Sequence, residues 1–134
     1  MISNVWSVLC RDIITDQETN SVSYLRCIEE GSAASLPVRI GPLFLGTLWE
    51  KTGQEKESIM FRITLQTPGN VSQVLMQTKS VFLDRPRHRL NFRISSLNIA
   101  DFGTYHVIVE YSQGQEWVQG SRLPVLIRKI QSQG

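Results

Sequence analysis

The chain has few of the residues on which catalysis and metal binding usually depend. Its 134 residues include two cysteines, Cys10 and Cys27, and two histidines, His88 and His106. These four stand at no spacing typical of a metal site, and neither histidine has an acid and a nucleophile beside it in the sequence. A glycine-rich phosphate loop and a nucleophile elbow are also missing. We therefore expect no cofactor, no metal and no catalytic residues, and interpret the protein as a non-enzyme; the alternative is an active site assembled only in space.

The chain also lacks a large excess of one charge sign and long apolar runs. Lysine and arginine exceed aspartate and glutamate by only two, for a net charge of +2. This excess is too small to indicate a nucleic-acid or membrane partner. No segment approaches the roughly 18 consecutive apolar residues of a membrane helix. The first ten residues lack a basic stretch and a cleavage site, so we expect an intact N-terminus and a cytoplasmic protein.

The two cysteines are interpreted as free, buried thiols, the default in a reducing compartment. If residues 16–20 turn the chain, residues whose numbers sum to about 37 face each other across the resulting hairpin. Cys10 and Cys27 meet that condition, although a slip of one residue would separate them. A cross-strand disulfide is the alternative.

What is present indicates a single folded domain over residues 1–134. Hydrophobic residues make up 41% of the chain and charged residues 19%, which excludes a disordered or fibrous protein. A domain of this length buries enough surface for a core without covalent staples.

The dominant sequence period is two, as in half-buried strands. Apolar and polar residues alternate over 59–66, 89–95 and 105–111. Less regular strands are expected over 5–14, 22–30, 38–50, 71–81 and 123–130. The strand that contains Gly41-Pro42 should have a kink or a bulge there, or should lie at a sheet edge. Residues 95–100 could form one helical turn. The pattern predicts an all-β, mostly antiparallel two-sheet sandwich of eight or nine strands.

One short motif specifies the type of sandwich. Asp101, Gly103 and Tyr105 open the strand over 105–111, an arrangement that resembles the tyrosine corner of immunoglobulin-like domains. There, the tyrosine hydroxyl bonds to backbone upstream and secures the crossing between sheets. Val107 stands where antibody domains have a cysteine, so apolar packing should replace the bridge between sheets. The alternative is a plain turn with Gly103 at positive φ.

A wider resemblance covers roughly the whole chain. It rests on turn and core residues: Asp16-Gln17-Glu18-Thr19-Asn20-Ser21-Val22-Ser23-Tyr24, Ile28-Glu29-Glu30, Leu36-Pro37 and Gly46-Thr47-Leu48-Trp49. With these residues the chain resembles a family of uncharacterised small bacterial proteins, a domain of unknown function. The resemblance implies a bacterial or phage-derived cytosolic β-sandwich. It implies no activity and no functional residues.

Two groups of residues are candidates for binding. Arg87, Arg89 and Arg93 fall on one side of a strand and could contact an anion, although no aromatic residues interleave for base stacking. The alternative is a solvated strand face that discourages aggregation. Trp117 follows a hairpin turn, where an exposed aromatic could anchor a partner.

The leading hypothesis is therefore a non-catalytic protein-interaction or structural module, acting through a strand edge or the loops at one end. A protein partner or a second copy is expected at Leu123–Ile127 or at the Trp117 hairpin, unless the former is a central strand. The alternative function is a small-ligand binder with a pocket between the sheets or at their mouth.

Overall fold

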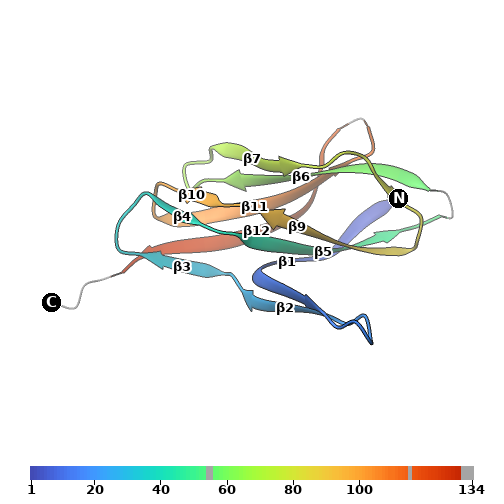
Figure 1. Ribbon diagram of the computed structural model, residues 1–134. Coiled ribbons are helices and arrows are strands. Elements are labelled where there is room, and N and C mark those ends of the chain that lie inside the picture. The colour runs from blue at the N-terminus through green and yellow to red at the C-terminus, as the bar shows by residue number, and fades with distance from the viewer. Residues whose placement is uncertain (54–55, 115, 131–134) are drawn as a thin grey trace.

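The structure is a computed structural model that describes residues 1–53, 56–114 and 116–130, and these residues form twelve strands and no helix (Figure 1). The strands are β1 (Ile2–Thr15), β2 (Val22–Cys27), β3 (Glu30–Ala33), β4 (Val38–Ile40), β5 (Leu43–Lys51), β6 (Glu57–Gln66), β7 (Ser72–Gln77), β8 (Val81–Leu83), β9 (Arg87–Ile94), β10 (Leu97–Ile99), β11 (Gly103–Ser112) and β12 (Val118–Lys129).

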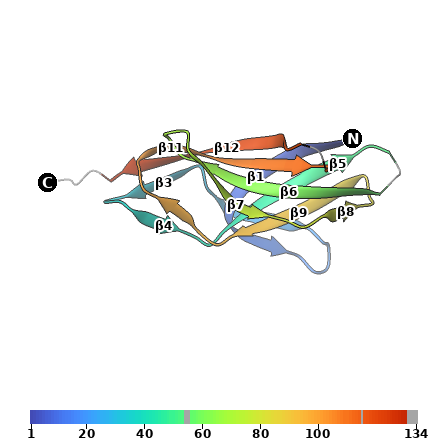
Figure 2. The ribbon, with the colours of Figure 1, turned by 90° about the horizontal axis from the view of Figure 1, so that it is seen from above.

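The strands form two main layers. One sheet has the order β2-β1-β5-β9; the other has the order β3-β12-β11-β6-β7, with β8 also paired to β6. A small β10-β4 pair lies at one end (Figures 1 and 2). All pairings in the described residues are antiparallel except β3 with β12. The predicted all-β, mostly antiparallel two-sheet sandwich is confirmed.

The predicted number of eight or nine strands is too low, because three expected stretches are interrupted and β10 was not expected. The stretch 22–30 ends as β2 at Cys27, and β3 begins at Glu30. The stretch 38–50 divides into β4 and β5 at Gly41-Pro42, and 71–81 divides into β7 and β8. Gly41 has φ 152°, and a side chain there would collide with the Ser95 backbone. The predicted helical turn over 95–100 is wrong, since Leu97–Ile99 pairs with β4 as a strand.

Aromatic contacts join the two sheets within the core. Trp49 of β5 is fully buried, and its ring centroid lies 4.8 Å from that of Phe61 on β6 and 5.3 Å from that of Tyr111 on β11. The Trp49 Nε1 donates to Thr47 Oγ1 at 2.7 Å, which satisfies the indole within the core. Val107 is also fully buried. Apolar packing thus occupies the place of a bridge between sheets, as predicted.

The tyrosine corner is confirmed. Tyr105 is 1% exposed, and its hydroxyl donates to the Asp101 carbonyl at 2.8 Å and accepts from the Asp101 amide at 3.1 Å. Gly103 lies between them with φ 129°, a conformation that favours glycine. The motif therefore fixes the crossing from β10 into β11.

We predict that Tyr105→Phe lowers the free energy of unfolding by about 1 kcal/mol, the net contribution of one hydrogen bond. Urea denaturation measures this. Tyr24→Phe is the matched control, because the Tyr24 hydroxyl donates at 3.0 Å to exposed Asn91; it should cost less than about 0.5 kcal/mol. Equal losses for the two variants would contradict the assigned role of the corner.

Candidate interaction surface

Most free edges of the sandwich are protected against pairing with another chain. On β9, Arg87, Arg89 and Arg93 are all exposed. On β2, Arg26 forms an ion pair of 2.6 Å with Asp12 of β1. The third edge, β3, has only four residues. Charged side chains and short length are the usual protection of an edge strand.

The β7 part of the edge formed by β7 and β8 lacks this protection, because β7 has six residues and no charged side chain. Both strands pair with β6 and, in the described structure, with no other strand (Figure 2). Within 71–83, Lys79 is the one charged residue, and there is no proline. Three apolar side chains on this stretch are exposed: Val71 at 65%, Val74 at 53% and Phe82 at 69%. We name residues 71–83 the open edge.

A hollow of about 320 Å³ adjoins the open edge on the outer face of the larger sheet. Its lining comes from β6, β7, β11 and β12: Arg62, Thr64, Ser72, Val74, Ile108, Glu110 and Gln119. Arg62 donates to both carboxylate oxygens of Glu110 at 3.2 and 2.9 Å, and Thr64 Oγ1 donates to the same carboxylate at 3.0 Å. The Arg62 and Glu110 side chains are only 24% and 18% exposed. The pair therefore has a fixed geometry beside the open edge.

Trp117 belongs to this surface. The Arg62 guanidinium carbon lies 4.3 Å from the centroid of the Trp117 ring, a cation–π contact. Trp117 is half-buried, so one face of the ring is covered by Arg62 rather than presented to a partner. The sequence indicated Trp117 but missed Arg62, Glu110 and the open edge, although the scarcity of charge over 71–83 was a visible signal.

The other predicted binding residues lie elsewhere. Arg87, Arg89 and Arg93 belong to the smaller sheet, so the structure does not bring them to Trp117. Arg87 donates to Glu50 at 3.3 Å and Arg93 donates to Ser95 Oγ at 3.4 Å. These contacts fit the solvated strand face that was the alternative interpretation.

The segment Leu123–Ile127 is not a free edge along its whole length. It pairs with β11 throughout, and from Leu126 onward it also pairs with β3. Its first part borders a cavity of about 470 Å³ at the seam where β1 and β12 meet. The lining is mostly apolar: Ser7, Val8, Leu9, Cys27, Ile28, Glu29, Glu30, Thr104, Leu123, Pro124 and Leu126. We name this the seam cavity.

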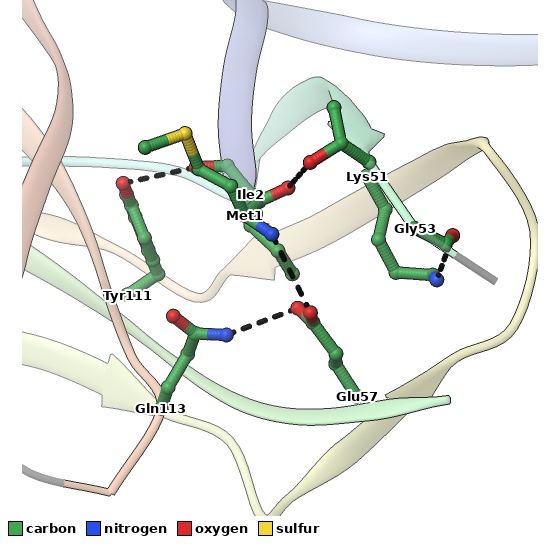
Figure 3. Close-up of polar contacts among 8 residues, drawn as sticks. Met1, Ile2, Lys51, Gly53, Glu57, Tyr111 and Gln113 are labelled. Carbon is green, nitrogen blue, oxygen red and sulfur yellow. Dashed lines mark hydrogen bonds and ion pairs between the residues drawn. The ribbon is translucent and has the colours of Figure 1, made fainter. Parts of the chain in front are cut away.

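A polar cluster fastens the first strand at one end of the sandwich (Figure 3). Glu57 accepts from Gln113 Nε2 at 3.0 Å and forms an ion pair of 3.5 Å with the Met1 amino group. The Tyr111 hydroxyl donates to the Ile2 carbonyl at 3.2 Å, and buried Lys51 donates to the Gly53 carbonyl at 2.9 Å. These bonds tie β1 to β6 and β11, which is a structural role.

The described residues contain no group of three histidine, cysteine, aspartate or glutamate side chains that could hold a metal ion. His106 lies on the outer face of the larger sheet, and its pKa is lowered by burial and then by the charge of Arg122. Within the described part of the chain, no helix is long and apolar enough to cross a membrane.

Comparison with known proteins adds no family: the chain matches no protein-family model and no curated protein sequence.

We predict that Glu110→Gln destabilises the protein by about 1.5 kcal/mol, because a half-buried guanidinium loses its charge-assisted bonds. Glu30→Gln is the control, since the Arg128–Glu30 pair of 3.2 Å is 61% and 57% exposed; it should cost no more than about 0.5 kcal/mol. Urea denaturation of both variants makes the comparison. A Glu110→Gln effect as small as the control would show that the Arg62 site is not organised by this pair.

Proposed function

We propose that the chain is a non-catalytic protein-interaction module that binds an extended, weakly charged strand of a partner chain along the open edge. The observation that supports this most is the contrast among the edges: β9 carries three exposed arginines, β2 carries Arg26 and β3 is short, whereas β7 carries no charged side chain. An unpaired strand edge offers a row of amides and carbonyls to which another strand can add.

A second copy of the chain is one such partner. Antiparallel pairing of β7 with β7 of another copy would place uncharged residues opposite one another: Ser72, Gln73, Val74, Leu75, Met76 and Gln77. The same pairing at β9 would bring Arg87, Arg89 and Arg93 close to their own copies, and like charges across strands are destabilising. The adjoining hollow includes Arg62, and arginine is among the residue types that contribute most to binding at interfaces.

We predict that the protein self-associates at micromolar concentration and that Val74→Lys weakens this association by about tenfold or more, equivalent to about 1.4 kcal/mol. A lysine on the edge strand must lose hydration when a second strand pairs there. Sedimentation velocity over a concentration series measures the effect. Ser23→Lys, an exposed position on β2, is the matched control and should leave the association unchanged.

A labelled peptide with the sequence of residues 71–80 separates a dimer from a module for other chains. Fluorescence anisotropy should show saturable binding that Val74→Lys weakens and Ser23→Lys does not. Binding of the peptide by a protein that stays monomeric would assign the edge to a different partner. A monomer that also fails to bind the peptide would refute the proposal.

The seam cavity supports a second candidate, the binding of a small apolar ligand. Its volume of about 470 Å³ lies within the range of ligand pockets, and it opens between the two sheets. Leu9, Ile28 and Leu123 supply apolar walls. Glu29 and Glu30 also line the cavity.

We predict that the dye anilinonaphthalene sulfonate, used as a probe, binds to the native protein and that Leu123→Trp weakens its binding by about tenfold or more. The larger ring occupies the space the dye would take. Ile14→Trp, at a position 53% exposed on the β1–β2 hairpin, is the control. Fluorescence titration that finds no saturable binding, or equal binding to both variants, would remove this candidate.

The resemblance to small bacterial proteins and a cytoplasmic location are further parts of the proposal.

A further inference from the structure

Cys10 and Cys27 are direct neighbours across the β1–β2 hairpin. The register pairs Cys10 with Cys27 and Ile13 with Tyr24, so the predicted sum of 37 holds. The Ile28 amide donates to the Leu9 carbonyl at 2.8 Å, one residue beyond the cysteine pair on each strand. That is the arrangement next to a non-hydrogen-bonded pair, in which the Cα atoms are about 4.5 Å apart and side chains approach most closely. This spacing falls within the range that a disulfide can span, about 4.4–6.8 Å.

The two thiols differ in their surroundings, which corrects the prediction that both are buried. Cys10 is fully buried, whereas Cys27 is exposed. Alternation along β2 breaks at Arg26, which has φ 56°, and this explains the exposure of Cys27. Burial raises the pKa of Cys10, and the neighbouring Cys27 adds to the effect. Cys27 is therefore the thiol that reacts first with a reagent from solution. Buried Cys10 reacts only with a mixed disulfide already formed on Cys27.

We propose that Cys10 and Cys27 form a reversible dithiol–disulfide pair that exchanges with a low-molecular-weight disulfide such as oxidised glutathione. The Cys27 thiolate attacks one sulfur of oxidised glutathione, forms a mixed disulfide and releases one glutathione thiolate. The Cys10 sulfur then attacks the Cys27 sulfur, forms the intramolecular disulfide, and releases the second glutathione. The protein loses two protons and two electrons, and one oxidised glutathione takes them up to become two reduced molecules.

The position of the pair gives the oxidation a structural consequence. β2 is the outer strand of its sheet and pairs only with β1 within the described structure. The chain continues from Cys27 through Ile28 to Glu30, which form one wall of the seam cavity. A bond between Cys10 and Cys27 anchors this wall to β1. The inference is independent of partner binding at the open edge.

Treatment of the native full-length protein with oxidised glutathione, followed by acid quench and intact-mass measurement, tests the proposal. The wild type should lose two hydrogen atoms without becoming a dimer, and reduced glutathione should reverse the change. Cys10→Ser should stop at one glutathione adduct, which peptide mapping places on Cys27. Cys27→Ser should remain unmodified while folded, because Cys10 is buried, and should react once it is unfolded in urea.

Three results would overturn the proposal. The first is a wild-type protein that keeps a glutathione adduct on Cys27 and never forms the internal disulfide, as Cys10→Ser does. The second is oxidation only to disulfide-linked dimers. The third is a wild-type protein in which both thiols stay reduced at the same ratio of oxidised to reduced glutathione that modifies the Cys10→Ser variant.

Discussion

The contact of Trp49 with Phe61 and Tyr111 is the interaction on which the rest of the structure depends. It joins the two sheets within the core, and fully buried Val107 takes the position that a bridging cysteine has in antibody domains. Aromatic rings bury large apolar areas, and such ring pairs contribute beyond their area. Because this aromatic packing holds the two sheets together, a disulfide between the sheets is not needed. Cys10 and Cys27 can therefore lie on the β1–β2 hairpin, outside the contact between layers.

The core holds the two sheets together but does not cover the strand edges. Residues on those edges must therefore prevent unwanted pairing with other chains. Arginines on β9, the Arg26–Asp12 pair on β2 and the short length of β3 each oppose pairing with another chain. Residues 71–83 have one charge and three exposed apolar side chains. Since their neighbour on the outer face is a rigid Arg62–Glu110 pair capped by Trp117, the edge and the hollow form one continuous surface. This is why we assign binding to the open edge rather than to the arginines of β9.

Local patterns predicted the fold well, and non-local pairings were missed. Alternation over 59–66 and 105–111, the corner at Tyr105 and the hairpin register of Cys10 all depend on short stretches of chain, and the structure has them. The strand β10 and the parallel pairing of β3 with β12 depend on segments far apart in sequence. The same holds for the candidate surface. Trp117 was visible as an aromatic beside a turn, but its contact with Arg62 joins residues far apart in the sequence, and only folding brings them together.

Hydrogen–deuterium exchange measured over a protein concentration series tests most directly whether the open edge is the binding surface. The account predicts that amides of Ser72–Gln77 become more protected as concentration rises, or when the peptide of residues 71–80 is added. Amides of β9 and β2 should be unaffected. Protection that appears at β9 or β2, or no change at Ser72–Gln77 under either condition, would contradict the account.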